Sequence, residues 1–278
     1  MRVYKYMSLT SFGKSVLGGQ VFLKTSRPSE FNDPYEGKGV IVGDPSVAFA
    51  HEWVKAFSLE QIVEEGKSLD EDTLMRIVCK GNMVGRFGWF NFFDDLVRIV
   101  CFCSPDAVLR PESDLLMWSH YADSGRGVRL ELELDDSTFS LKDIVYSEAR
   151  PKLDLRLVAH CDPRTDPVFA KFLNDCILTK PRAWAYELEK RLVLSKDSDQ
   201  LRYASPMDEY KGASECDLVL RLPGECLKAV SLGAKMDNLV NTQDLMKKVR
   251  NDGFGHVKFA RAIFGDTYAY DYANLFDD

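Results

Sequence analysis

Hydrophobic and polar residues alternate most regularly between residues 127 and 136. In this segment Val128, Leu130, Leu132 and Leu134 alternate with charged residues. A period of two places the four apolar side chains on one face of a strand and the charged ones on the other. The segment therefore predicts a half-buried β-strand.

Weaker patterns predict further elements on both sides of this strand. Short apolar or β-branched runs predict strands at 19–26, 98–104, 143–148, 184–195, 217–223, 227–233 and 256–265. Helical spacing, capping residues and glycine stops predict helices at 10–19, 68–81, 166–180 and 242–253.

The order of these elements predicts the fold class. From residue 44 to about residue 98 the apolar spacing is helical, and the remainder of the chain is rich in strands. We expect an α+β fold with a mixed, mostly antiparallel sheet as its core and a helical block inserted at 44–98, because regular βαβ alternation is missing. No repeat or linker divides residues 1–278, so we expect a single domain with a loosely packed end at 272–278.

Composition narrows the possible partners. The chain has 278 residues, with 43 acidic against 36 basic side chains and a net charge of −7. This balance argues against a broad basic surface for nucleic acid, which needs many phosphate contacts. We find no secretory signal and no run of about 18 apolar residues, and therefore expect a cytoplasmic protein without a membrane span.

The seven cysteines predict thiols rather than disulfides. Their number is odd, and only Cys101 and Cys103 lie close together, on one face of a predicted strand. No second close pair or histidine cluster accompanies them, so we expect reduced, mostly buried thiols and no bound metal.

Four polar clusters carry the candidate chemistry, and the first two lie near the start of the chain. At 3–8, Lys5 lies between Tyr4 and Tyr6 in an extended segment. At 26–37, Asn32 begins an Asn-Asp-Pro sequence, which is typical of a turn.

The third cluster, at 115–127, combines aromatic residues with glycine. Trp118 and Tyr121 are neighbours on a helix, and the sequence leaves open whether Trp118 belongs to the core or to a binding site. His120 is expected to be a solvated helix residue. Gly125 and Gly127 are expected to turn the chain into the next strand.

The fourth cluster, at 180–195, has two acidic residues and a basic one at every second position. If this segment is a strand, Glu187, Glu189 and Arg191 share one face. Two interpretations remain open for that face. It is either an exposed charge ladder, or a pair of carboxylates directed into a cleft, where each raises the pKa of the other.

Taken in order, these motifs resemble a bacterial family known as domain-of-unknown-function family 2971. The resemblance runs from residue 3 to about residue 191 and rests on several short motifs in a fixed order. The matching residues are Tyr4-Lys5-Tyr6, Phe31-Asn32-Asp33-Pro34, Met117, Trp118, His120, Tyr121, Gly127, Val128, Lys180, Trp184, Glu187, Glu189 and Arg191.

The layout is also similar to that of NAD-dependent ADP-ribosyltransferases. This resemblance implies that Lys5 contacts NAD, that Tyr121 or Trp118 packs on nicotinamide, and that Glu189 or Glu187 carries catalysis. Lys5 stands where that fold usually has His or Arg. Asn32 and Arg191 complete the residues expected to contact NAD.

The resemblance implies an enzyme that transfers ADP-ribose from NAD to an unknown acceptor, in phage defence or in a toxin system. A carboxylate that faces the developing oxocarbenium ion would stabilise the transition state, as in glycoside hydrolysis. Two other classes remain open. One is a non-catalytic binding module, and the other is a metal-dependent nuclease built on Asp33, Glu187, Glu189 and Lys190.

Overall fold

A computed structural model describes residues 1–42, 94–154, 167–203, 218–236 and 242–275. The chain packs as two compact units. The main unit comprises Met1–Arg27, Val97–Ile144 and Ala183–Asp278, and the second unit comprises Pro28–Leu96 and Val145–Arg182. Because compact units need not fold independently, the single domain expected over residues 1–278 stays a prediction.

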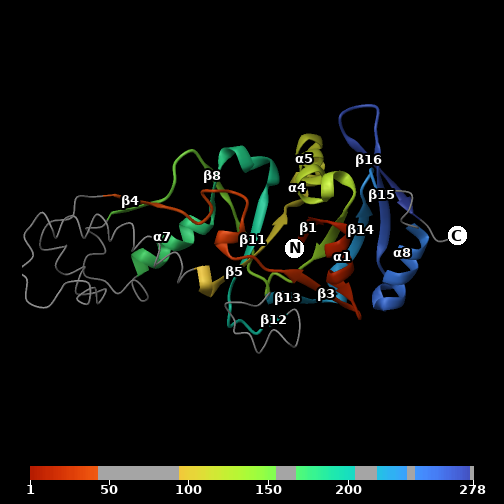
Figure 1. The fold of residues 1–278 in the computed structure, drawn as a ribbon, viewed down its shortest axis with the longest axis horizontal. Coiled ribbons are helices and arrows are strands. Elements are labelled where there is room, and N and C mark those ends of the chain that lie inside the picture. Colours follow the sequence, from red (N-terminus) through yellow and green to blue (C-terminus); the bar gives the residue numbers. More distant parts are fainter. Residues whose placement is uncertain (43–93, 155–166, 204–217, 237–241, 276–278) are drawn as a thin grey trace, which may run out of the picture. The chain divides into compact units, whose positions relative to one another are not determined.

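An eight-stranded sheet forms the centre of the main unit (Figure 1), in the order β16-β15-β14-β6-β1-β5-β11-β7. Only β14 and β15 pair in parallel among these strands, and the other neighbours are antiparallel. This confirms the mixed, mostly antiparallel sheet. The strands are β1 (Arg2–Met7), β5 (Val97–Cys103), β6 (Val128–Glu133), β7 (Lys142–Asp143), β11 (Glu189–Ser195), β14 (Leu227–Leu232), β15 (Lys258–Phe264) and β16 (Tyr270–Leu275).

A second sheet of the same unit has the order β12-β13-β3-β2. Its strands are β2 (Val16–Leu17), β3 (Gln20–Lys24), β12 (Leu201–Tyr203) and β13 (Leu218–Pro223). Both sheets contribute to one hydrophobic core, which includes Leu23 and Leu220 from the second sheet and Leu130 and Val230 from the main sheet. We call the side of the main sheet that enters this core the core face.

The strand predicted from the alternation at 127–136 is confirmed as β6. Val128, Leu130 and Leu132 have no exposed surface and lie in the core. Helices α1 (Leu9–Ser15) and α8 (Thr242–Val249) add Phe12 and Met246 to the same core. A π-helical turn, Arg250–Phe254, follows α8.

The opposite side of the main sheet packs against α4 (Pro105–Leu109) and α5 (Pro111–Tyr121), and we call it the α5 face. Tyr4 and Tyr6 of β1 and Trp118 of α5 are buried there, with the rings of Tyr6 and Trp118 5.3 Å apart, edge to face. Trp118 has no exposed surface, which confirms that it is a core residue.

Two predicted elements have other limits in the structure. One ends before a pair of glycines, and the other begins after a residue with a positive φ angle. The helix expected at 10–19 ends at Ser15, and Gly18 and Gly19 (φ 56° and 72°) form the two-residue turn between β2 and β3. Consecutive positive φ angles are typical of the tight hairpin turn that glycine favours.

The strand expected at 184–195 begins only at Glu189. Residues Arg182–Glu187 form a 3-10 helix, η4, and Leu188 has a φ of 42° before β11 starts. The carbonyl of Leu188 accepts a hydrogen bond from the backbone N–H of Ser104 at 3.0 Å, which stabilises this turn. Alternation along the sequence could not reveal a left-handed leucine, because only tertiary contacts hold a non-glycine residue there.

In the second unit, β4 (Val40–Val42) pairs in parallel with β9 (Lys152–Asp154), and β8 (Val145–Ser147) with β10 (Thr179–Pro181). The predicted helix at 166–180 is confirmed as α7 (Pro167–Ile177). A 3-10 turn, Pro28–Glu30, starts the unit.

Two other predicted segments are described only in part. Residues 44–93 of the helical block expected at 44–98 lie outside the described residues, as does the helix expected at 68–81. Val97 and Arg98, at the end of the expected block, belong to β5. At the C-terminus, where a loose end was expected at 272–278, residues 272–275 pair with β15 as part of β16, and 276–278 lie outside the described residues.

None of the helices in the described ranges combines the length and the apolar character that crossing a membrane requires.

The turn from α5 into β6 depends on close backbone approach, as expected from its glycines. A 3-10 turn, Asp123–Gly125, follows α5, and the N–H of Gly127 donates to the carbonyl of Ala122 at 2.7 Å. A Cβ atom at Gly127 would lie 2.2 Å from the carbonyl oxygen of Met7. A side chain at this position would therefore have to displace β1.

We predict opposite effects of alanine at two glycines. Gly127→Ala lowers the free energy of unfolding by about 1–3 kcal/mol because the new methyl group overlaps backbone atoms. Gly13→Ala raises it by about 0.5–1 kcal/mol, because Gly13 is exposed within α1 and a Cβ there meets nothing within 4 Å. Urea unfolding of both variants tests this, and equal shifts would contradict the close approach.

Candidate functional site

The two carboxylates of the fourth cluster are buried. Glu187 is the last residue of η4 and Glu189 the first of β11, and their exposed fractions are 3% and 5%. The charge ladder on an exposed strand face is therefore wrong. These carboxylates lie inside the main unit, where each needs polar partners.

Glu189 pairs with Arg191 two residues along the same strand. Nε of Arg191 donates to Oε1 of Glu189 at 2.7 Å, and Nη2 donates to Oε2 at 3.2 Å. Arg191 has no exposed surface. The two parallel bonds match the fork of the guanidinium to the carboxylate, which is the strongest geometry for such a pair.

Glu187 is held by Tyr121, the last residue of α5. The Tyr121 hydroxyl donates a short hydrogen bond to Oε1 of Glu187. His120 and Tyr186 lie beside them, with Nδ1 of His120 2.8 Å from the Tyr186 hydroxyl oxygen. We call Tyr121, Glu187, Glu189 and Arg191 the carboxylate cluster. The structure thus brings together four of the predicted site residues.

Cys101 and Cys103 lie on the same sheet face as this cluster, which confirms their predicted shared face. Cys103 is directly opposite Glu189, and Cys101 opposite Arg191. Burial raises the pKa of the Cys103 thiol well above its usual value, and the charges of Glu187 and Glu189 raise it further. Burial and then Glu189 likewise raise the pKa of Cys101. Both thiols are therefore protonated at neutral pH and are poor nucleophiles.

Lys5 lies on the other face of the sheet. It pairs with Leu130 across β1 and β6, and Leu130 belongs to the hydrophobic core. Its ammonium donates to the carbonyl of Cys101 at 2.9 Å and lies 5.7 Å from the centre of the Phe102 ring. The structure therefore does not bring Lys5 to the face that carries Glu187 and Glu189.

Asn32 belongs to the second unit and is exposed. The next residue, Asp33, is 4% exposed, and its Oδ1 accepts the backbone N–H of Tyr35 at 2.9 Å. This bond closes a turn in the way that Asp and Asn side chains usually do, and it confirms the turn predicted at 32–34.

A second buried network on the α5 face was missed by the sequence analysis. Asp114, in the first turn of α5, is 3% exposed. Its Oδ1 accepts the Tyr6 hydroxyl at 2.5 Å and Nη1 of Arg129 at 3.1 Å, and its Oδ2 accepts the Tyr272 hydroxyl at 2.5 Å. Trp118 adds a bond from Nε1 to the Tyr272 hydroxyl at 2.9 Å.

Aromatic rings surround the guanidinium of Arg129. Its central carbon lies 4.3 Å from the ring centre of Tyr272 and 5.3 Å from that of Tyr4. The rings of Tyr6 and Trp118 lie at 5.9 and 6.0 Å. Burial disfavours the charge of Arg129, but Tyr6, Tyr272 and Asp114 raise its pKa above the ordinary value. We call Arg129 and the five residues around it the Arg129 cage: Tyr4, Tyr6, Asp114, Trp118 and Tyr272. The cage keeps the buried guanidinium of Arg129 charged.

One sequence signal for this cage exists in retrospect. Asp114 precedes Trp118 by four residues, so both lie on the same side of α5, and that side packs on β1 and β6. A carboxylate on the buried side of a helix needs a cation or hydrogen-bond donors on the opposing element.

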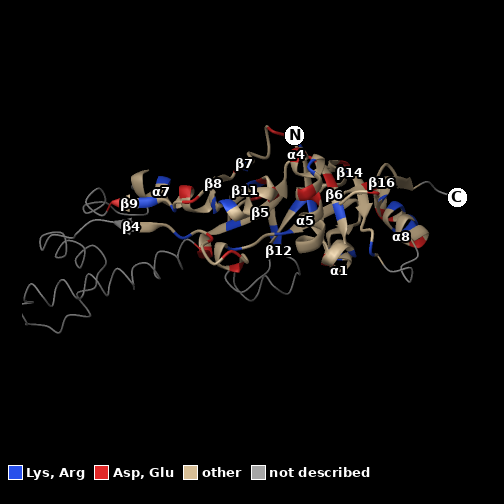
Figure 2. Cartoon of the chain, turned by 90° about the horizontal axis from the view of Figure 1, so that it is seen from above, with Lys and Arg blue, Asp and Glu red and all other residues tan. Residues whose placement is uncertain are grey.

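Acidic and basic residues are interspersed along the described elements (Figure 2). Within the described part of the chain, no group of three or more His, Cys, Asp or Glu side chains is placed to hold a metal ion.

Comparisons with known proteins gave no match to a protein-family model, to a curated protein or to a solved structure. The resemblance to family 2971 therefore rests on the motifs quoted above.

We predict unequal stability effects for two adjacent ion pairs on β11. Arg191→Met lowers the free energy of unfolding by about 3–5 kcal/mol because Glu189 loses its buried guanidinium partner. Lys190→Met changes it by less than about 1 kcal/mol, because its partner Asp143 is 80% exposed. Urea unfolding measures both.

The double variant Glu189→Gln/Arg191→Met is the control for this pair. It regains part of the lost stability, because no unpaired charge is left by the removal of Arg191. Additive losses from Glu189→Gln and Arg191→Met would show that the pair is not the stabilising unit.

Proposed function

We propose that this chain is an ADP-ribosyltransferase-like enzyme that transfers ADP-ribose from NAD to an acceptor at the carboxylate cluster. One observation carries the proposal. Two carboxylates, Glu187 and Glu189, are buried on one side of the main sheet, and each is oriented by a specific hydrogen-bond donor. Buried carboxylates with fixed orientation are typical of sites that stabilise a developing positive charge.

The reaction breaks the bond between the ribose C1′ and the nicotinamide nitrogen. The bonding electrons leave with nicotinamide, so that C1′ acquires oxocarbenium character, and an acceptor nucleophile then bonds to C1′ and loses its proton. In this proposal Glu187 faces the ribose and stabilises that charge, as carboxylates do in glycoside hydrolysis. Tyr121 orients Glu187 through its hydroxyl.

Glu189 serves as a positioning residue in this scheme. Its two oxygens are bound by Arg191, so its negative charge is fixed beside Cys103 and close to Glu187. Arg191 acts through Glu189 and has no separate role with NAD.

Aromatic side chains next to the cluster suit the nicotinamide ring. Tyr121 and Tyr186 are half-buried, and the rings of Trp184 and Tyr186 lie 6.2 Å apart. Offset or edge contacts with such rings stabilise a flat heteroaromatic group. Trp118 is committed to the Arg129 cage, so we assign this contact to Tyr121 and not to Trp118. Because Glu187 is 3% exposed, NAD reaches it only when neighbouring side chains move.

We predict that Glu187→Gln lowers NAD turnover by about 10²–10⁴-fold, the usual range for loss of a catalytic carboxylate. Tyr121→Phe lowers turnover by about 10–100-fold because it removes one hydrogen bond to a charged group. Release of labelled nicotinamide is measured with and without RNA, DNA and cell lysate as acceptors.

Glu225→Gln is the matched control, since Glu225 is exposed and lies in the 3-10 turn Gly224–Cys226, away from the cluster. It should react at the original rate. Far-UV circular dichroism establishes that each variant is folded. If the original protein neither binds NAD nor releases nicotinamide, the cluster is structural and the chain is a non-catalytic binding module.

A further inference from the structure

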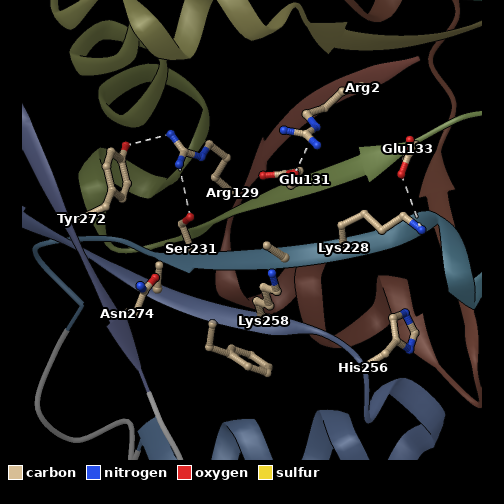
Figure 3. A pocket seen from close by; sticks show the side chains of 13 residues that line it. Arg2, Arg129, Glu131, Glu133, Lys228, Ser231, His256, Lys258, Tyr272 and Asn274 are labelled. Atoms are coloured by element: carbon tan, nitrogen blue, oxygen red, sulfur yellow. Dashed lines mark hydrogen bonds and ion pairs between the residues drawn. The ribbon is translucent and has the colours of Figure 1, made fainter.

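A groove of about 570 Å³ lies on the α5 face of the main sheet, over β6, β14, β15 and β16 (Figure 3). Its lining comes from the main unit alone. Ligand sites for small molecules usually have a volume of about 300–1,000 Å³, so the groove is of suitable size for one.

The sequences of β14 and β15 explain why the groove exists. Ala229, Ser231 and Ala260 form its floor, while their neighbours Val230 and Phe259 belong to the hydrophobic core. The small side chains of Ala229, Ser231 and Ala260 leave space above the middle of these strands, and the lysines Lys228 and Lys258 stand beside that space. The flanking strands β6 and β16 carry longer side chains on this face, such as Glu131 and Tyr272, and these side chains form the walls of the groove.

A β-bulge increases the number of polar groups at one end of the groove. The pairing of β14 with β6 is irregular between Leu227 and Ala229, and both Lys228 and Ala229 line the groove. Bulges commonly redirect a side chain at functional places in a sheet. Here the bulge directs Lys228 toward Glu133, with 3.6 Å between Nζ and Oε2.

Basic groups exceed acidic ones along the groove, although the whole chain has a net charge of −7. The two carboxylates of the lining are engaged, since Glu131 pairs with Arg2 at 3.2 Å and Glu133 with Lys228. Lys258 is exposed and has no ion pair among the residues that the structure describes. The groove thus contains a cation that is available to an anion.

Other polar groups of the lining lie one step along the sheet from Lys258, since Ser231, Arg129 and Asn274 are in register with Ala260. Arg129 lines the groove and donates from Nη2 to the hydroxyl oxygen of Ser231 at 3.2 Å. Tyr272 and Asn274 of β16 also line the groove, and the Tyr272 hydroxyl accepts a hydrogen bond from Nη1 of Arg129 at 2.8 Å (Figure 3). Arg129 is 7% exposed and anchored by Asp114, so its position is fixed before a ligand arrives.

We propose that this groove binds a small phosphate monoester that carries hydroxyl groups, of the sugar-phosphate class. The phosphate binds Lys258 beside Arg129, Ser231 and Asn274, and the hydroxyl groups donate to Glu131 and Glu133. A point charge on a flexible stem suits a phosphate, and carboxylates accept hydrogen bonds from sugar hydroxyls. This site does not depend on the proposed transfer of ADP-ribose.

Titration calorimetry with three probes tests the class of ligand. Ribose 5-phosphate is expected to bind, whereas ribose and inorganic phosphate bind at least ten times more weakly because each lacks half of the contacts. Raising the salt concentration weakens the binding of ribose 5-phosphate, since salt screens the phosphate from Lys258. Equal binding of ribose and ribose 5-phosphate, or binding of neither, would overturn the proposal.

Lys258→Gln tests the assigned residue. It is expected to weaken ribose 5-phosphate binding at least tenfold without loss of folding, because Lys258 is exposed. Lys248→Gln makes the same charge change on the exposed side of α8, outside the groove lining, and should bind as the original protein does. Unchanged binding by Lys258→Gln would refute the assignment.

Glu187→Gln separates the two proposals. It should lose NAD turnover and keep its affinity for ribose 5-phosphate, because Glu187 does not line the groove. Each proposal can therefore fail while the other stands.

Discussion

The buried guanidinium of Arg129 constrains the arrangement of the α5 face. A cation on a covered sheet face destabilises the fold by several kcal/mol unless a counter-charge and hydrogen bonds accompany it. Asp114 supplies the charge, and Tyr272 and Ser231 accept further bonds. Because Asp114 lies in the first turn of α5, the helix has to dock with that turn next to β6. The other end of the helix, at Tyr121, is then close to Glu187.

The α5 face has two regions of opposite electrostatic character. Near β11, two carboxylates, Glu187 and Glu189, lie with one buried guanidinium, Arg191, whereas near β6 the buried guanidinium of Arg129 pairs with the single carboxylate of Asp114. Cys103 lies between them, since β5, which carries it, stands between β11 and the strands β1 and β6 in the sheet. A reaction that develops positive charge suits the first region, and an anionic ligand suits the groove that extends from the second.

The sequence predicted the elements with simple periodicity well and the buried polar groups poorly. Alternation at 127–136 identified β6 and its core leucines, but it also suggested that Arg129 faced solvent, because alternation cannot show that a distant helix covers this side chain. The segment at 184–195 contains the end of a 3-10 helix and a strand, which are separated by Leu188. Leu188 has a left-handed conformation, and its carbonyl accepts a hydrogen bond from the N–H of Ser104. Lys5 was expected beside the carboxylates, yet its place in β1 fixes it on the core face. In each case the missing information was a contact between residues far apart in the chain.

The Arg129 cage also has a consequence for how the chain folds. Its hydrogen bonds join Asp114 to Tyr6, 108 residues away, and to Tyr272, 158 residues away. Contacts between such distant residues form late and slow folding, because a long loop has to close before they give any stability. Tyr272 belongs to β16, the edge strand at the C-terminal side of the sheet. During synthesis, Arg129 therefore emerges before two of its partners, since Ser231 is made with β14 and Tyr272 only with β16.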